Sequence, residues 1–461
     1  MALMFFNAHP RDYMELQCGP MRLTWLIAAA LTFMPATISA QFGAPDTDVR
    51  IAKLVASISE ARMEQLLRTL VGFGTRNTLS DVTSTTRGIG AARQWILDEL
   101  ARTSPKLQVS FDTHQVPKGG RITRDVELRN IVAILPGRTP RRIYVSGHYD
   151  TVNLGAQGQG GLNTAGGGYG SPADNADAPG ADDDGSGTVL VMELARVFAE
   201  SGLTFDATLV FTAVAGEEQG LIGAREEARG VKAANIPVQA IFNNDIVGGS
   251  VGGDGIVDGA TIRLYAEGPE DSPSRSLAVF TRRIAAHYVP SHRIRLMARR
   301  DRFGRGGDHT AWNLEGFAAV GFRESRENYS KQHNANDTID GVSFAYLGQN
   351  ARVNAAAMAV LALAPPPPVV ATDRGAPRLD RRPSGYDAHL QWIASPGAAG
   401  YRIFWREAWA PDWQHEMFVG NVTEYTLPHA NVDDWVFGVA AVAADGHEST
   451  VSAYVPAPPT Y

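Results

Sequence analysis

Three consecutive aspartates form the stretch of this sequence with the most distinctive chemistry. They lie in residues 180–187, GADDDGSG, and an apolar pattern with helical spacing begins directly after them at Val189. Carboxylates this close together repel one another, so such a run is ordinarily a solvated loop. At the start of a buried helix, a divalent cation between the carboxylates relieves that repulsion. The run therefore indicates a metal site.

Further polar side chains follow the predicted strands of the same region or lie in a later polar segment. They are His148, Asp150, Glu217, Glu218, Asp245 and His333. Open α/β sheets place their sites just beyond the carboxyl ends of their strands, where most of these residues fall. Each residue alone has an ordinary explanation, such as a hydrogen-bonded histidine, a solvated Glu-Glu pair or a helix cap. Together, in one α/β unit, they are hard to explain without a metal.

The ligand types are those of a two-metal site. Each metal would take one imidazole and one carboxylate, and a further carboxylate would bridge the two metals. We assign the imidazoles to His148 and His333, the bridge to Asp182, and the terminal carboxylates to Glu218 and Asp245. This set of nitrogen and oxygen ligands suits zinc, with cobalt or manganese as alternatives.

Two neighbouring acids have supporting roles in this interpretation. Successive side chains of an extended segment point apart, so Glu217 is free of the metal that Glu218 binds. Glu217 can then act as general base toward a metal-activated water. Asp150, two residues after His148, is placed to accept the other imidazole N–H and fix the tautomer.

Four more polar residues carry weaker signals. Asp183 and Asp184 are interpreted mainly as caps of the following helix, with Asp183 also holding the geometry of the bridge. Asp308 and His309 lie in the polar, glycine-rich loop 301–313. They are candidate pocket residues, and ordinary loop polarity explains them equally well.

The composition restricts the class of protein. A chain of 461 residues is too long for one ordinary core, so more than one domain is expected. The net charge of −7 argues against a general binder of nucleic acid or of membrane surfaces. The one cysteine, Cys18, excludes a disulfide framework and thiolate zinc sites.

The N-terminal 40 residues predict export. A basic start at Met21-Arg22 precedes the apolar run 23–34 and the small residues 36–40, which is typical of a signal peptide cleaved after Ala40. Residues 1–20 are interpreted as an upstream extension, with translation starting at Met21. The apolar run is too short to span a bilayer comfortably, so no stable membrane span is expected after cleavage. We expect a secreted or periplasmic protein; an uncleaved anchor is the alternative.

Alternating strands and helices predict an α/β fold, with a mostly parallel sheet covered by helices on both faces. Strands are expected over 109–116, 127–135, 142–146, 207–215, 238–242 and 316–323. Helices are expected over 46–75, 86–100, 185–199, 221–229, 276–287 and 346–363. This catalytic region spans 41–363, after the extension and signal peptide in 1–40. A proline-rich linker, 364–370, then leads to short period-two strands in 371–461, the pattern of a small all-β sandwich.

The motifs resemble those of peptidase family M28, the co-catalytic zinc aminopeptidases. The resemblance runs from Gly72 to Leu363 and rests on SGHYDT at 146–151, PGADDDGSG at 179–187, GEEQGLIG at 216–223, ND at 244–245, GDH at 307–309 and HNANDT at 333–338. It implies an aminopeptidase-type fold, two zinc ions and hydrolysis of the N-terminal peptide bond of peptides or proteins.

The resemblance also implies roles for individual residues. By it, His148, Asp182 and Asp245 hold one zinc, and Asp182, Glu218 and His333 hold the other. Glu217 is then the general base, and Asp150 supports the first histidine.

The sequence departs from the family in two places. Many relatives carry a tyrosine directly before the final histidine, whereas this chain has Gln332 there and Tyr329 earlier, so the oxyanion-stabilising residue stays open. We treat Tyr329 as a candidate pocket residue. The glycine-rich insertion 155–179 is unusually long and is expected to shape or cover the pocket.

The C-terminal region resembles a fibronectin type III domain, with Trp392 in the place of the early core tryptophan. Such a domain would bind a polymer or a surface ligand, or only add stability. Two alternatives to an aminopeptidase stay open. One is another activity of the same fold, carboxypeptidase-like or glutaminyl cyclase-like, the latter with one zinc. The other is a non-catalytic binding protein that uses the β-sandwich.

Overall fold

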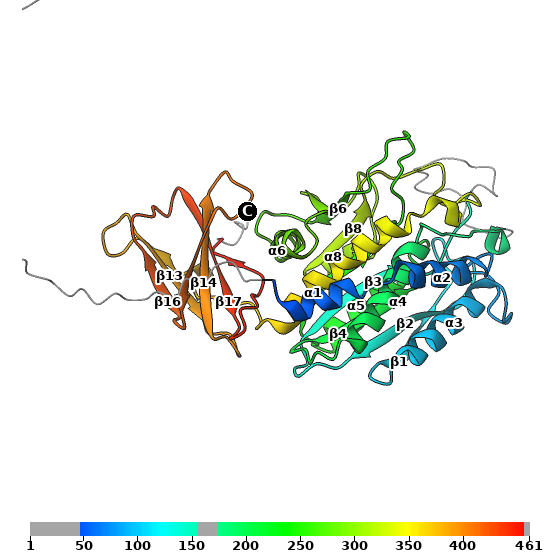
Figure 1. Ribbon diagram of the computed structural model, residues 1–461, viewed down its shortest axis with the longest axis horizontal. Coiled ribbons are helices and arrows are strands. Elements are labelled where there is room, and N and C mark those ends of the chain that lie inside the picture. Colours follow the sequence, from blue (N-terminus) through cyan, green and yellow to red (C-terminus); the bar gives the residue numbers. More distant parts are fainter. Residues whose placement is uncertain (1–46, 155–172, 456–461) are drawn as a thin grey trace, which may run out of the picture. The chain divides into compact units, whose positions relative to one another are not determined.

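Eight strands form one mixed sheet in the order β1-β2-β4-β3-β5-β8-β6-β7 (Figure 1). The computed structural model describes residues 47–154 and 173–455. The strands are β1 Gln108–Val116, β2 Val126–Leu135, β3 Arg142–His148, β4 Thr208–Val214, β5 Val238–Asn244, β6 Thr261–Ala266, β7 Arg293–Met297 and β8 Ala319–Glu324. β4-β3, β3-β5, β5-β8 and β6-β7 pair in parallel, and β1-β2, β2-β4 and β8-β6 are antiparallel. The expected α/β fold is confirmed, with antiparallel pairs toward both edges of the sheet.

Helices cover both faces of this sheet. They are α1 Val49–Ala56, α2 Glu60–Val71, α3 Gly88–Thr103, α4 Gly185–Glu200, α5 Ile222–Ala233, α6 Pro273–Tyr288, α7 Asp308–Leu314 and α8 Phe344–Leu363. One large core joins the sheet to α1, α2, α3, α4, α6 and α8. Smaller clusters pack α5 and α7 against the other face, around Tyr144 and Trp312.

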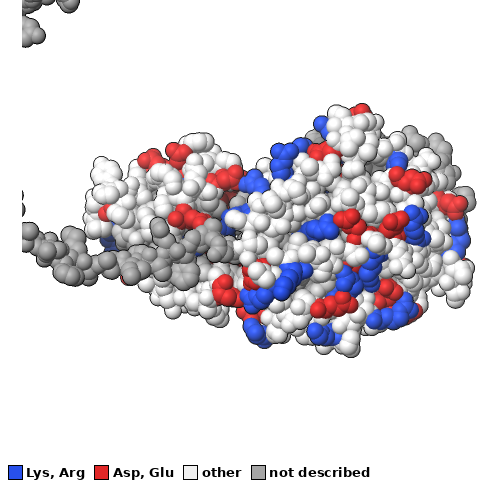
Figure 2. Space-filling view, viewed as in Figure 1, with Lys and Arg blue, Asp and Glu red and all other residues white. Residues whose placement is uncertain are grey.

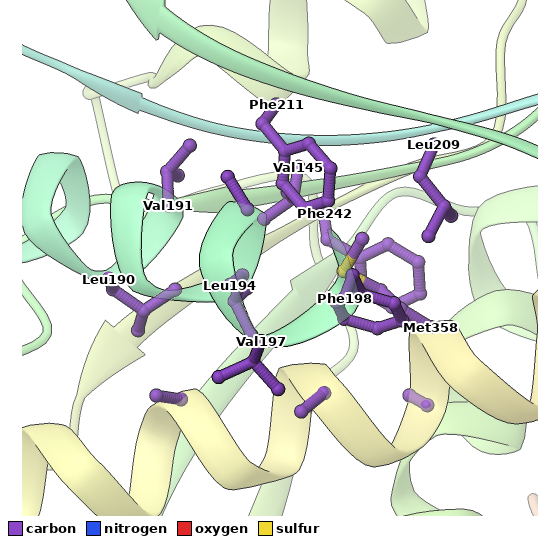
Figure 3. Packing of buried hydrophobic residues seen from close by; sticks show 14 of the residues in the cluster. Val145, Leu190, Val191, Leu194, Val197, Phe198, Leu209, Phe211, Phe242 and Met358 are labelled. Atoms are coloured by element: carbon purple, nitrogen blue, oxygen red, sulfur yellow. The ribbon is translucent and has the colours of Figure 1, made fainter. Parts of the chain in front are cut away.

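Helix α4 lies at the centre of the large core and fixes the position of the aspartate run before it. Its apolar side chains, together with those of the strands and of α8, are shown in Figure 3: Val145, Leu190, Val191, Leu194, Val197, Phe198, Leu209, Phe211, Phe242 and Met358. The rings of Phe198 and Phe211 lie 6.0 Å apart. Because α4 is buried on nearly all sides, its N-terminus cannot shift without disturbing the packing of the core.

The structure corrects three local predictions. The single helix expected over 46–75 is broken into α1 and α2, because Ser59 caps α2 by accepting the N–H of Arg62 at 3.2 Å. β6 and β7 were not predicted, since arginines interrupt their apolar pattern. The polar loop 301–313 ends in α7, a short helix that begins at Asp308.

The C-terminal region consists of antiparallel strands. They are β9 Val369–Val370, β10 Thr372–Asp373, β11 Ala376–Pro377, β12 Leu379–Asp380, β13 Ala388–Ile393, β14 Gly400–Glu407, β15 His415–Gly420, β16 Glu424–Leu427, β17 Trp435–Val442 and β18 Ser452–Ala453. β9, β12, β13 and β16 form one sheet, β15, β14, β17 and β18 another, and β10 pairs with β11. Trp392 and Tyr401 meet in the core between the sheets, with ring centroids 5.4 Å apart. The fibronectin type III resemblance stays a prediction.

Several predictions concern residues outside the described ranges. The signal peptide, its cleavage site and most of the insertion 155–179 belong to them. Among the described residues, none of the helices is both long and apolar enough to cross a membrane. On the face shown in Figure 2, acidic and basic side chains are interspersed, and neither sign forms one continuous patch.

Candidate metal centre

Four neighbouring strands bring the sequence motifs to one edge of the sheet. β4, β3, β5 and β8 lie side by side and run parallel, so their carboxyl ends meet. His148 ends β3, Glu218 follows β4, Asp245 follows β5, and His333 lies in the segment after β8. The aspartate run 182–184 reaches the same edge because α4 packs on these strands.

Two groups of side chains meet at this edge and share one carboxylate. In the first group, Nε2 of His148 lies 3.3 Å from Oδ1 of Asp183 and 3.7 Å from Oδ1 of Asp245. In the second, Nε2 of His333 lies 3.1 Å from Oδ2 of Asp183 and 3.5 Å from Oε2 of Glu218. Within each group the candidate ligand atoms lie within 4.8 Å of one another. This is the arrangement of two metal positions joined by Asp183.

The bridging residue differs from the one we predicted. Asp182 belongs to neither group: its Oδ1 accepts the N–H of Gly248 at 2.8 Å, and its carboxyl group pairs with that of Glu324. Asp184 caps the helix, which leaves Asp183 facing the two imidazoles. Three identical residues in a tight turn have no periodicity from which the inward one could be chosen. The assignment of Asp182 as the bridge is therefore corrected to Asp183.

Asp184 connects three of the converging segments. Its Oδ1 accepts the N–H of Gly187 at 2.8 Å, in the first turn of α4, as expected of a cap. The same carboxylate also accepts the N–H of His148 at 2.9 Å and that of Ile246 at 3.2 Å. It thereby links the ends of β3 and β5 to the start of α4.

Arg76 and Asp337 both hold the segment that carries the aspartate run. The buried Arg76 guanidinium donates to the carbonyl oxygens of Tyr149, at 2.6 Å, and of residues 179–180, at 2.6 and 2.8 Å. Asp337 accepts the N–H groups of residues 182–183, both at 2.9 Å. Sequence reasoning missed both roles. Asp337 lies in the HNANDT motif and could have been found there, whereas nothing in the sequence marks Arg76.

Asp150 supports the centre differently from the prediction. The ring nitrogen Nδ1 of His148 lies 3.1 Å from the backbone carbonyl of Asp150 and 3.6 Å from its carboxylate. The carboxylate accepts the N–H groups of Glu217 and Glu218, both at 3.2 Å, and the hydroxyl of Thr78 at 3.1 Å. Asp150 therefore orients the imidazole through its carbonyl, and the Glu-Glu segment through its side chain.

The centre contains buried polar atoms that make no hydrogen bond among the described residues. They include Nε2 of His148, Oδ2 of Asp183 and Oε1 of Glu218. Leaving buried donors and acceptors unpaired is costly, so such atoms usually have a ligand. These three atoms belong to the two groups around Asp183, and nitrogen and oxygen donors are the ligands that zinc accepts. The residues present therefore fit a metal pair.

The pKa shifts of the two histidines and of Asp183 also favour a cation in this centre. Burial lowers the pKa of His148, but the carboxylates, Glu217 first, outweigh burial and raise it well above its usual value. Burial likewise lowers the pKa of His333, yet Glu218 and Asp183 raise it to about 9. Burial raises the pKa of Asp183, but the two imidazoles hold it well below its usual value. The carboxylates therefore favour positive charge in this centre, which a bound cation would supply.

The three candidate pocket residues have different surroundings. Asp308 is 1% exposed, and neither carboxylate oxygen has a hydrogen-bond partner in the described part of the chain. Burial, followed by the charge of Glu217, raises the pKa of Asp308 well above its usual value, which places it beside the centre. His309 instead contacts the carbonyl of Arg300 at 2.8 Å through Nε2. Tyr329 is 46% exposed at the surface. Of the three, Asp308 faces the centre.

Comparisons with known proteins find relatives in sequence and in fold. A probable zinc metalloprotease of Pyricularia oryzae is 37% identical over 453 residues, which cover 89% of this chain and 85% of the relative. An aminopeptidase, LapA of Legionella pneumophila, superposes with a TM-score of 0.50 at 20% identity, over 68% of this chain and 74% of its own. A glutaminyl cyclase of Porphyromonas gingivalis superposes with a TM-score of 0.50 at 17% identity, over 65% and 98%. The solved structures show the fold alone.

The sequence profile of peptidase family M28 matches residues 130–358. This range contains all five residues of the two groups, His148, Asp183, Glu218, Asp245 and His333. The Pyricularia oryzae relative is similar over most of the chain, and the profile matches its central part. The chain therefore belongs to peptidase family M28.

Proposed function

We propose that this zinc metalloprotease is an exported aminopeptidase that removes N-terminal residues from peptides with the help of two zinc ions. The observation that carries the proposal is the pair of His-carboxylate groups that share Asp183, with Glu217 free beside them. The first zinc would be held by His148, Asp183 and Asp245, and the second by Asp183, Glu218 and His333. When bound, zinc lowers the pKa of a water molecule and polarises the scissile carbonyl.

Glu217 is suited to carry the proton of the attacking water. Its side chain is partly exposed, and its carboxylate makes no side-chain hydrogen bond among the described residues. The carboxylate of Asp150 accepts the backbone N–H of Glu217 and so fixes the position of Glu217. This contact leaves the carboxylate oxygens of Glu217 itself free. Burial and the acidic neighbours Asp245 and Asp183 raise the pKa of Glu217 to about 7, close to the optimum for a general base. Glu217 would take this proton at its carboxylate and pass it to the leaving amine.

The acidic surroundings of the centre favour a substrate with a free amino terminus. Asp308 and Glu217 are both carboxyl groups whose side chains make no hydrogen bond in the described ranges, and burial, followed by the charge of Glu217, raises the pKa of Asp308. A group with a raised pKa gives up its proton when a cation arrives beside it. The ammonium group of a peptide would supply that cation, whereas an acetylated terminus would not.

Export and domain organisation remain part of this proposal. Residues 21–40 would be the signal peptide, so the mature chain would begin at Gln41. The region 371–461 would be a fibronectin type III-like domain for a polymer or surface ligand.

Hydrolysis of paired substrates tests the proposal. A panel of aminoacyl chromogenic amides is offered to the zinc-loaded protein, each beside its N-acetylated form, together with a peptide that begins with glutamine. We expect cleavage of the free amides and none of the blocked ones. Preferential release of ammonia from the glutamine peptide, without cleavage of any amide, would instead indicate a glutaminyl cyclase.

A further inference from the structure

Three arginines lie directly opposite one another on adjacent strands at the β7 edge of the sheet. Arg323 of β8 pairs in register with Arg263 of β6, and Arg263 pairs with Arg295 of β7. Like charges directly opposite in a sheet are destabilising. The repulsion between these side chains therefore lowers the stability of the sheet. We call the three residues the arginine row (Arg263, Arg295 and Arg323).

The inner end of this row touches the metal centre. Nη1 of Arg323 forms an ion pair with the carboxylate of Asp245 and donates to its carbonyl at 3.2 Å. Asp245 is a candidate metal ligand. At the other end, Arg295 is exposed on the edge strand. The row thus extends from the metal centre to the surface.

Two further arginines from the loop after β7 join the row around one glutamate. Nη1 of Arg302 lies 2.7 Å from Oε2 of Glu327, and Nη1 of Arg305 lies 3.3 Å from the same atom. Nη2 of Arg263 lies 2.6 Å from the other oxygen, Oε1. One carboxylate is therefore shared by three guanidinium groups.

Guanidinium groups outnumber carboxylates among the residues paired around Glu327 and Asp245. Four guanidinium groups, of Arg263, Arg302, Arg305 and Arg323, surround the carboxylates of Asp245, Asp301 and Glu327. Burial raises the pKa of Glu327, but Arg302 and the other guanidinium groups lower it to about 2. The negative charge of Glu327 is therefore compensated by these arginines. A metal ion would draw on the charge of Asp245 as well. Among these seven residues the guanidinium groups therefore outnumber the carboxylates by one.

Arg305 is the guanidinium placed to meet that partner. Its side chain is 18% exposed, whereas Arg302 is 7% and Arg323 is 1% exposed. Both of its hydrogen bonds use Nη1, to Glu327 and, at 3.1 Å, to Gln332. Within residues 47–154 and 173–455, Nε and Nη2 have no hydrogen-bond partner. Gln332 directly precedes His333, and the charge of Arg305 acts to lower the pKa of His333, so the guanidinium lies near the second metal position.

We propose that Arg305, supported by the arginine row, binds a carboxylate of the substrate close to the scissile bond. The inference rests on the proposed function and narrows its substrates to short or acidic peptides. A guanidinium with two free, adjacent N–H donors matches the two oxygens of a carboxylate. That carboxylate is either the C-terminus of a di- or tripeptide or an acidic side chain just after the N-terminal residue.

Paired peptides distinguish the two sources. One pair is a dipeptide with a free or an amidated C-terminus, and the other is a tripeptide amide with Glu or Gln at its second position. Each is hydrolysed by the zinc-loaded protein, by Arg305→Gln and by the control Arg326→Gln, whose side chain is 43% exposed and paired with Asp254. We expect kcat/KM of the wild type to be about tenfold or more higher for the carboxylate member of at least one pair. Arg305→Gln should remove that preference through KM, and Arg326→Gln should retain it.

A binding measurement separates failure of this inference from failure of the proposed function. The same peptides, carrying a fluorescent label, are titrated against zinc-loaded Glu217→Gln protein with and without Arg305→Gln. Equal affinity for both members of both pairs would overturn the carboxylate subsite, even if every peptide is cleaved by the wild type. An equal loss of affinity for all four peptides in Arg305→Gln would overturn it as well, because it would show a structural role only. A preference in binding without any cleavage would retain the subsite and refute the aminopeptidase.

Discussion

Replacing Asp183 by asparagine should weaken metal binding, and replacing Asp182 by asparagine should leave it unchanged. Asp183 belongs to both groups of candidate ligands, at 3.3 Å from His148 and 3.1 Å from His333. Asp182 belongs to neither group and instead accepts the N–H of Gly248 at 2.8 Å. Asp183→Asn therefore removes a shared negative ligand, whereas Asp182→Asn changes a residue outside the ligand set and keeps an oxygen that can accept the N–H of Gly248.

The size of the difference follows from binding linkage. A metal present at a hundred times its dissociation constant stabilises a folded protein by about 2.7 kcal/mol for each site. Two sites give about 5 kcal/mol, which for a domain of this size corresponds to a rise in Tm of about 10 °C. Asp183→Asn should lose most of this rise. Asp182→Asn should keep the rise, because any change that it makes in Tm should be the same with and without zinc.

The assay is thermal unfolding of the three proteins after chelation and after return of zinc, with bound metal counted by elemental analysis. A full zinc-dependent rise and unchanged metal content in Asp183→Asn would refute the assignment of the bridge. Loss of the rise in Asp182→Asn, with Asp183→Asn unaffected, would restore the original sequence prediction.

Three further predictions concern groups outside the ligand set. Arg76→Met should weaken Co²⁺ binding about 10- to 100-fold, seen in the visible absorption of the metal, whereas the buried control Arg275→Met should lower only Tm. Asp337→Asn should weaken Co²⁺ binding in the same titration, because Asp337 fixes the two N–H groups next to the bridge. Burial, together with the charge of Asp112, raises the pKa of Glu227 to about 8 from 4.5, so the folded protein binds a proton that the unfolded chain has lost. Stability should fall as pH rises from 4.5 to 8, by at most about 5 kcal/mol, and urea midpoints of Glu227→Gln should lack this component.

Much of the centre could be predicted because its ligands lie at the ends of apolar strands. His148, Glu218 and Asp245 each follow a strand that the sequence marks by its apolar run, and parallel strands must bring their ends together. The choice between Asp182 and Asp183 could not be made in this way, because the direction of a side chain in a tight turn depends on the caps and braces around it.

Residues whose partners lie far away in the sequence were not predictable. Arg76 acts on the carbonyl oxygens of residues 149 and 179–180, and no local pattern records such contacts. The arginine row depends on the register of β6, β7 and β8, of which only β8 was expected. The helix over 46–75 was predicted as one because its apolar period continues through the break at Ser57, where the caps interrupt it.

The most direct test of the account uses Glu217→Gln loaded with zinc. Glu217 lies outside both groups of candidate ligands, so the variant should bind as much zinc as the wild type and show the same zinc-dependent rise in Tm. Its turnover of a free aminoacyl amide should fall by at least about a hundredfold, because the general base is gone. Retained turnover with full metal content would contradict the account.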